Sequence, residues 1–409
     1  MINTSVSKNP RTQDVNPEVL SKSISGLPLT AEEAYGLISM FYDGLEDLCS
    51  TAAKIRDNRK QTFLTFSPKV FIPLTRLCRD TCSYCTFRVE PDNTAKIFMS
   101  PDEVLDVAKR GQRLGCTEAL FTLGERPEKR YPEAQNWLNR NGYHTTLQYL
   151  ADMCKMVNEK TDLLPHANPG TMSKREMAEL KPYNPSMGLM LENISPQLFA
   201  KGGPHEFAPS KRPTVRIKTI TIAGTLKIPF TTGLLIGIGE TLEERIESLL
   251  YIKSIHKQFG HIQEVIIQNF RAKPQTQMES HPDASTKDLL WTIAVARLIL
   301  GSQVNIQVPP NLSAQNYHVY IDAGINDWGG ISPLTIDYVN PEAPWPALSE
   351  LRQKTESKGF SLRPRLSIYP EFIFSDKNFL GKEMMSKTVA MTDSEGYVKE
   401  GIERYAQSN

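Results

Sequence analysis

The chain has 409 residues, of which 40% are hydrophobic and 23% charged, and its 47 Lys and Arg nearly balance 46 Asp and Glu. This composition is typical of a globular enzyme, and a net charge of +1 excludes a broad electrostatic attraction to nucleic acid or to an acidic membrane. No apolar run approaches the roughly 20 residues that cross a bilayer, and residues 1–20 lack the apolar core of a secretory signal, so we expect a cytoplasmic protein.

The sequence divides into four parts by composition. Residues 1–29 are polar and contain Ser, Asn and Pro, which predicts a disordered N-terminal extension. Residues 30–60 show the apolar spacing of one or two amphipathic helices that lead into the main domain. Residues 61–374 carry strand-like and helical patterns, and residues 375–409 have the composition of a loop-like tail. We therefore expect one catalytic domain with additions at both ends.

Strand-like apolar runs alternate with helical patterns through the central part, which is typical of βα units around a parallel sheet. Eight candidate strands lie at residues 69–74, 118–123, 164–168, 186–191, 230–236, 264–269, 305–308 and 328–331. Capping patterns, in which a Glu follows a Ser or Thr after three residues, predict helix starts at Ser100, Ser173 and Thr241. The sequence thus predicts the α/β class and a TIM-type (β/α)8 barrel, whose chemistry collects at the carboxyl ends of its strands.

Three cysteines, Cys78, Cys82 and Cys85, follow the first candidate strand with spacings of three and then two residues. Thiolates are the usual protein ligands of iron–sulfur clusters, and three of them leave one iron of a cubane open. The alternatives are a structural zinc loop or a chance trio, but structural zinc normally takes four protein ligands and the nearest downstream histidine is His144. The remaining cysteines, at 49, 116 and 154, are scattered and are predicted to be small buried hydrophobic residues.

Two strand ends carry glycine-containing loops. After the second candidate strand comes the run Thr-Leu-Gly-Glu at 122–125, in which a glycine lets the backbone approach a ligand and Glu125 could accept from an ammonium group or simply lie in a surface loop. The fifth candidate strand runs into three glycines before Glu240, an order that differs from the dinucleotide-binding fingerprint. A tight strand-to-helix turn is the simplest interpretation of the second loop.

Charged side chains also follow the fourth candidate strand. The Glu192 carboxylate would suit a pair of hydroxyl donors, or it could cap a helix. Arg212 and Arg216 open the next helix, where a guanidinium could pair with a ligand carboxylate or lie on a solvated helix face.

The cysteine spacing resembles the signature of the radical S-adenosylmethionine enzymes. The resemblance implies a 4Fe-4S cluster whose open iron is chelated by the amino and carboxylate groups of S-adenosylmethionine. It further implies that the loop Thr122, Leu123, Gly124 and Glu125 holds the methionyl amine, although Leu123 replaces a glycine of the usual pattern. The roles implied for the other cofactor residues are a ribose contact for Glu192, a carboxylate contact for Arg216, and adenine contacts for Gly237 and for Tyr84, which could otherwise be a packed loop tyrosine.

Longer segments are similar to the cyclising component of the 7,8-didemethyl-8-hydroxy-5-deazariboflavin synthases. They lie at residues 73–78, 232–240, 268–274, 309–312 and 324–333, within a similarity that covers about 60–370. The resemblance implies a radical ring closure on 5-amino-5-(4-hydroxybenzyl)-6-(D-ribitylimino)-5,6-dihydrouracil with loss of ammonium. It also implies a one-electron donor such as ferredoxin or flavodoxin and a sister component that uses tyrosine, with neither nucleic acid nor membrane as a partner.

Such a substrate needs polar groups at the later strand ends, but no residue can be singled out as the catalytic acid or base. The candidates are His166, Asn168, Gln268, Asn269, Arg271, Asn311 and Asp327. For each of them a satisfied loop or barrel-lining role is the alternative. Two other functions stay open: another radical S-adenosylmethionine reaction, including the sister coupling step with tyrosine, and a noncatalytic barrel that binds an iron–sulfur cluster or zinc.

Overall fold

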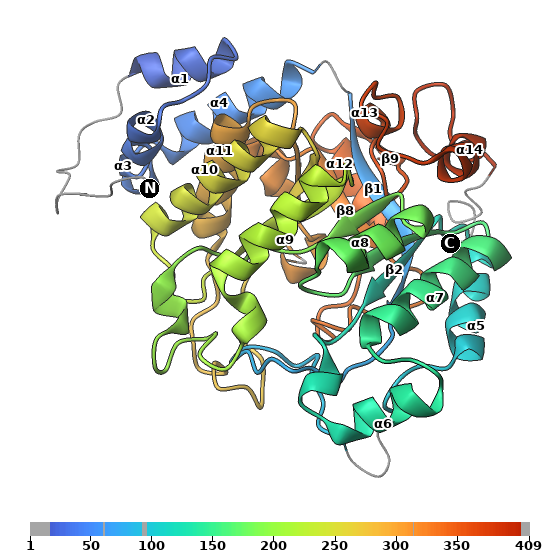
Figure 1. Ribbon diagram of the computed structural model, residues 1–409. Helices are drawn as coiled ribbons and strands as arrows, with labels where there is room; N and C mark the ends of the chain where they lie inside the picture. Colours follow the sequence, from blue (N-terminus) through green and yellow to red (C-terminus); the bar gives the residue numbers. More distant parts are fainter. Residues whose placement is uncertain (1–16, 60–61, 92–95, 314, 402–409) are drawn as a thin grey trace.

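The computed structural model describes residues 17–59, 62–91, 96–313 and 315–401 (Figure 1). Its centre is a closed barrel of parallel strands, because β1 hydrogen-bonds with both β2 and β8. The strands are β1 Phe63–Pro73, β2 Glu118–Thr122, β3 Leu164–Asn168, β4 Ser186–Gly188, β5 Phe230–Ile236, β6 Ile262–Asn269, β7 Asn305–Gln307 and β8 Asp327–Ile331. The prediction of a (β/α)8 barrel is confirmed, with all eight candidate strands present and the fourth shorter than expected.

The first strand is the longest in the barrel and also the least anticipated. It starts six residues before the predicted strand, and this added segment pairs with a ninth strand, β9 Ser361–Pro364, that the sequence analysis missed. Because β9 is only four residues long, the alternation of apolar and polar side chains in it is too short to predict a strand.

Helices surround the barrel and cover the outer faces of its strands (Figure 1). They are α5 Pro101–Arg113, α6 Pro132–Arg140, α7 Thr146–Lys160, α8 Lys174–Leu180, α9 Pro213–Thr225, α10 Leu242–Phe259, α11 Thr286–Leu300 and α12 Leu348–Glu356. Capping boxes at Ser100, Ser173 and Thr241 start α5, α8 and α10, as the sequence predicts. Since helices cover one face of β5 and barrel side chains the other, every position of that strand is buried.

The N-terminal part differs from the prediction of disorder. Residues 17–24 form α1 (Pro17–Ile24), and Lys22 in it makes an ion pair of 2.8 Å with Glu33; residues 1–16 lie outside the described residues. Three more helices follow, α2 Ala31–Gly36, α3 Ser39–Tyr42 and α4 Leu45–Asp57, and they lie beside α10 and α11 (Figure 1).

The C-terminal tail is a correction as well, because part of it is helical rather than loop. It contains α14 Lys382–Ala390, and its apolar side chains pack with those of α13 Pro370–Ile373 and with Leu164 at the start of β3. The Lys387 ammonium donates to the carbonyl oxygens of Asn158, Thr161 and Leu163. The tail therefore closes the amino-terminal end of the barrel, opposite the end where the cysteine loop lies.

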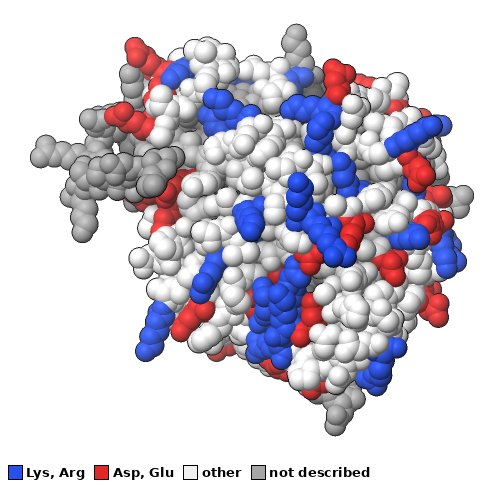
Figure 2. All heavy atoms as spheres, in the orientation of Figure 1, with Lys and Arg blue, Asp and Glu red and all other residues white. Residues whose placement is uncertain are grey.

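Charge is spread over the surface as composition suggests. Figure 2 shows acidic and basic side chains interspersed over one face of the molecule. In the described part of the chain, no helix combines the length and the apolar character that a membrane crossing requires.

Candidate active site

The cysteine loop follows β1 at the carboxyl end of the barrel. Cys78, Cys82 and Cys85 are half-buried free thiols, whereas the three scattered cysteines are buried as predicted. The Glu125 N–H donates to Cys78 Sγ at 3.2 Å, and the Arg79 N–H donates to the Glu125 carbonyl at 2.7 Å. The loop after β2 therefore holds the cysteine loop through backbone hydrogen bonds.

The chemistry of the thiols fits a metal cluster. Burial raises the pKa of the Cys78 thiol to about 12, so that this group needs a metal to displace its proton at neutral pH. Within the described part of the chain, no three His, Cys, Asp or Glu side chains converge closely enough to hold one metal ion. A cubane does not require that convergence, because each thiolate binds a different iron.

Gly124 permits the close approach of the two loops. A Cβ atom at this position would lie 1.9 Å from the Leu77 carbonyl oxygen and 2.9 Å from Cys78 Cβ. Only a residue without a side chain fits there. The loop that the sequence analysis associated with the methionyl amine thus also positions the first cysteine.

Glu125 is 5% exposed, and its side chain already has partners. Its carboxylate accepts from the Thr171 N–H at 2.9 Å and the Thr171 hydroxyl at 2.6 Å, with the Arg79 guanidinium at 3.4 Å. Burial raises its pKa, against the opposing effect of the Thr171 hydrogen bonds. Since a carboxylate offers about four lone-pair directions, Glu125 retains capacity for one further donor.

Glu192 lies in a buried cluster of charges after β4. Its backbone has a φ of +68°, which is uncommon for a residue other than glycine, and its carboxylate contacts the Lys211 ammonium and lies 3.7 Å from Arg216 Nη1. Burial opposes ionisation, but Lys211 and Arg216 hold the pKa of Glu192 below its usual range. The cluster carries two cations and one anion, so one positive charge remains that suits a ligand carboxylate.

Arg216 and Lys211 differ in how well the sequence indicated them. Arg216 is 4% exposed and donates to the carbonyl oxygens of Met190 and Ser210, which shows that it does not lie on a solvated helix face. Lys211 was missed, although it precedes Arg212 in the same basic segment. Burial raises the pKa of the Cys82 thiol, and the nearby Lys211 ammonium opposes this effect, so the charge cluster borders the cysteine loop.

Tyr84 pairs with a second residue that was missed. Its hydroxyl lies 2.9 Å from His205 Nε2, and burial followed by the Glu192 charge raises its pKa. Burial lowers the pKa of His205 to about 3, so the imidazole is neutral. The tyrosine is therefore anchored at the edge of the charge cluster.

The loop after β5 is a tight turn stabilised by its own glutamate. Gly237 has a φ of +89°, and the Glu240 carboxylate accepts from the N–H groups of Gly237 and Ile238 at 2.7 and 2.9 Å. Arg245 donates to the same carboxylate at 2.7 Å. These contacts support the tight-turn interpretation, and an adenine contact by Gly237 stays a prediction.

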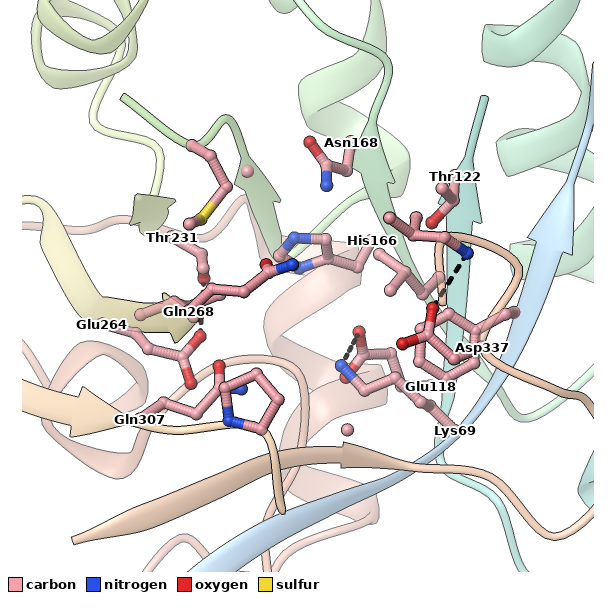
Figure 3. Close-up of a pocket in the computed structure, with 18 of the residues that line it drawn as sticks. Lys69, Glu118, Thr122, His166, Asn168, Thr231, Glu264, Gln268, Gln307 and Asp337 are labelled. Atoms are coloured by element: carbon pink, nitrogen blue, oxygen red, sulfur yellow. Dashed lines mark hydrogen bonds and ion pairs between the residues drawn. The ribbon is translucent and has the colours of Figure 1, made fainter. Parts of the chain in front are cut away.

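A cavity lies inside the barrel between the inward faces of its strands (Figure 3). His166, Asn168 and Gln268, all predicted as substrate residues, line it. Thr122 and Met190 also line it. Thr122 precedes the loop that contacts Cys78, and the Met190 carbonyl accepts from Arg216 of the charge cluster. The cavity therefore extends to the groups that could hold the cofactor.

The floor of the cavity is charged, and most of its residues were missed. Lys69 pairs with Glu118 at 2.8 Å, and Arg365 pairs with Glu264 at 2.7 Å. Gln307 and Asp337 also line the cavity (Figure 3). The sequence did contain a sign of these residues, because Lys69 and Glu264 are charged residues at the start of otherwise apolar strand segments. Charged residues at such positions usually lie just outside a strand, so they did not indicate a charged barrel interior.

Four predicted substrate residues lie elsewhere. Asp327 begins β8 at the amino-terminal end of the barrel, where it is fully buried and bound by Arg365 at 2.5 Å, so its prediction as a residue at the carboxyl end of a strand is wrong. Asn269, Asn311 and Arg271 line a separate pocket. Side chains alternate across a strand, so Gln268 faces the cavity and Asn269 cannot.

The comparisons with known proteins agree with this geometry. Residues 72–252 match the family model described as the radical SAM superfamily. The 7,8-didemethyl-8-hydroxy-5-deazariboflavin synthase of Methanopyrus kandleri is 51% identical over 336 residues, which cover 82% of this chain and 100% of that protein. The chain belongs to the 7,8-didemethyl-8-hydroxy-5-deazariboflavin synthase family. Its members named FO synthase from Nocardia farcinica and Mycobacterium tuberculosis are 50% and 49% identical, but the chain spans less than half of their length, 44% and 46%.

Solved structures support the fold of this family member. The FeFe-hydrogenase maturase HydG from Carboxydothermus hydrogenoformans aligns with a TM-score of 0.66 and 20% identity over 90% of this chain and 87% of that one. Methylornithine synthase aligns with a TM-score of 0.64 and 19% identity over 84% of this chain and 97% of that one. As a radical SAM synthase of this family, the chain is an enzyme of deazaflavin formation that uses a 4Fe-4S cluster and S-adenosylmethionine, a small-molecule substrate and an electron donor.

Proposed function

We propose that this chain catalyses the ring closure that converts 5-amino-5-(4-hydroxybenzyl)-6-(D-ribitylimino)-5,6-dihydrouracil, here called the adduct, into 7,8-didemethyl-8-hydroxy-5-deazariboflavin with loss of ammonium. The observation that carries this proposal is the polar cavity inside the barrel. At Thr122 the cavity reaches the loop whose Glu125 N–H binds Cys78, and at Met190 it reaches the charge cluster. Similarity to the whole of the Methanopyrus kandleri 7,8-didemethyl-8-hydroxy-5-deazariboflavin synthase also supports the proposal.

We assign the cofactor residues as follows. Cys78, Cys82 and Cys85 would hold the cluster, and Glu125 would accept from the methionyl amine. The surplus positive charge at Lys211 and Arg216 would pair with the methionyl carboxylate. When bound, these cofactors supply the 5'-deoxyadenosyl radical that takes a hydrogen atom from the substrate. Glu192 would contact the ribose, and Tyr84 and Gly237 would contact the adenine.

The cavity offers the chemistry that the adduct requires. The amides of Asn168, Gln268 and Gln307 can donate and accept, as the uracil edge demands. The carboxylates of Glu118 and Glu264 on the floor suit the hydroxyl groups of the ribityl chain. On the wall, Phe71 stacks on Trp345 with ring centroids 5.2 Å apart and an interplanar angle of 18°, and this apolar surface suits the hydroxyphenyl ring.

Two partners follow from this reaction. The electron donor would be a small one-electron carrier such as ferredoxin or flavodoxin. A sister component would supply the adduct from tyrosine and the ribitylaminouracil, because a chain with a single cysteine trio can supply only one such radical site.

The test is to give the reconstituted, reduced enzyme S-adenosylmethionine with either the adduct or tyrosine plus ribitylaminouracil. We expect 5'-deoxyadenosine, ammonium and a fluorescent deazaflavin from the adduct, and no turnover with tyrosine. Turnover with tyrosine, or silence with the adduct in an enzyme that still cleaves the cofactor, would assign the sister reaction instead.

A further inference from the structure

His166 projects from β3 into the barrel cavity with one ring nitrogen already committed. Its Nδ1 lies 2.7 Å from Ser186 Oγ, and Ser186 Oγ lies 2.6 Å from the Ser367 carbonyl oxygen. A carbonyl oxygen can only accept, so the single hydroxyl proton of Ser186 is donated to Ser367. Ser186 must then accept from His166, which fixes the proton of a neutral imidazole on Nδ1 and leaves Nε2 as a bare acceptor.

The groups around His166 keep the ring neutral. Burial lowers the pKa of His166 to about 4. Of the charged groups that face it, Glu118 on β2 raises this pKa, whereas Lys69 on β1 and Arg365 after β9 lower it. The effect of Glu118 is limited because that carboxylate already accepts from Lys69 at 2.8 Å and from Ser67 at 2.5 Å.

The free nitrogen has room for a substrate atom. His166 lies among the cavity-lining side chains in Figure 3. Within the described part of the chain, the hydrogen bond of its ring is the one from Nδ1 to Ser186, and Nε2 has no protein partner. A Cβ atom at Gly188 would lie 3.0 Å from this nitrogen, so the glycine keeps that side open.

We propose that Nε2 of His166 accepts the proton that ring closure releases, an inference that rests on the proposed function. Relative to the adduct, the deazaflavin lacks ammonia and two hydrogens. One hydrogen leaves as an atom to the 5'-deoxyadenosyl group. The other leaves as a proton from the phenyl carbon that gains the new carbon–nitrogen bond, and its electron passes to a one-electron carrier, the class of partner that the reaction already requires. Loss of this proton restores the aromatic ring, and His166 becomes an imidazolium that still donates to Ser186.

The central test compares His166→Gln with wild type and with His144→Gln, a control at an exposed histidine. We expect the His166 variant still to bind the adduct, measured in the protein without cofactors, and still to form 5'-deoxyadenosine. Deazaflavin formation should fall by about a hundredfold, the range of a lost general base, so the ratio of 5'-deoxyadenosine to deazaflavin rises. A wild-type rate and ratio in His166→Gln would overturn the proposal.

A second measurement does not depend on turnover. In protein with ¹⁵N-labelled histidines, the resonances lost in His166→Gln identify the ring, and we expect the neutral Nδ1-protonated form from about pH 5.5 to 8. Ser186→Ala should allow the other tautomer and reduce deazaflavin formation less than His166→Gln does. An Nε2-protonated ring in wild type would overturn the proposal, whereas a wild-type enzyme that makes no deazaflavin from the adduct would overturn the proposed function.

Discussion

Gly124→Ala should damage the cluster site without removing any ligand. The added Cβ would lie 1.9 Å from the Leu77 carbonyl oxygen, whereas ordinary contacts begin at 3.4 Å, so the two loops must separate by about 1.5 Å. Overpacking of this kind costs about 1–3 kcal/mol of stability, and a displacement of about 1 Å at a reacting centre can cost on the order of a hundredfold in rate. We therefore expect a folded protein that incorporates less iron and forms 5'-deoxyadenosine at least about a hundredfold more slowly.

The assay measures iron and sulfide per chain after reconstitution, 5'-deoxyadenosine formation and the urea midpoint. Gly381→Ala is the matched control, because a Cβ atom at Gly381 meets nothing within 4 Å and the backbone there has a φ of −70°. A Gly124→Ala variant with full iron content and a wild-type rate of cofactor cleavage would refute the argument that this glycine positions the cysteine loop.

Three further predictions test other parts of the molecule. Alanine at any of the three loop cysteines should abolish iron incorporation and 5'-deoxyadenosine formation, while Cys154→Ala should retain both; full iron content in a loop mutant would exclude that cysteine as a ligand. Glu192→Gln leaves Lys211 and Arg216 without their buried carboxylate, so we expect the unfolding free energy to fall by about 3–5 kcal/mol. We also expect weaker binding of S-adenosylmethionine in a titration, and an unchanged affinity would exclude Glu192 from the cofactor site. Burial lowers the pKa of His261 from 6.5 to about 4, so the neutral ring contributes its full stability above about pH 6.5. This contribution is lost as the pH falls toward 4, at about 1.4 kcal/mol per pH unit. The loss of urea stability between about pH 6.5 and 5.5 should therefore be smaller in His261→Gln than in wild type, and an equal loss would contradict this.

The local parts of the fold were predictable because they depend on neighbours in the sequence. Capping boxes form within four residues, and their positions at Ser100, Ser173 and Thr241 agree with the structure. The C-terminal helix α14 was not predictable in the same way. Its order depends on an apolar cluster with Leu164 and on hydrogen bonds from Lys387 to residues more than 200 positions earlier.

The cavity shows the same division. Gln268 and Asn269 are adjacent polar residues of similar chemistry, and only the pairing of β6 in the closed barrel decides which one faces inward. Asp327 had the right chemistry for a substrate contact, but β8 starts at this residue and therefore places it at the opposite end of the barrel. The direction in which a side chain points from its strand, and the residue at which the strand starts, thus decide which polar residues can reach the substrate. The sequence alone does not distinguish these residues.

By itself, the sequence determined the barrel, the cysteine loop and the glycine loops that flank it, because strand alternation, thiol spacing and turn chemistry are written in short segments. Only the tertiary structure decided which nitrogen of His166 carries the proton. The hydrogen bonds that decide it run from His166 on β3 to Ser186 and from Ser186 to the Ser367 carbonyl, which lies 181 residues after Ser186. A hydrogen bond that fixes a tautomer depends on atoms brought together by barrel closure, and no local pattern in the sequence encodes that closure.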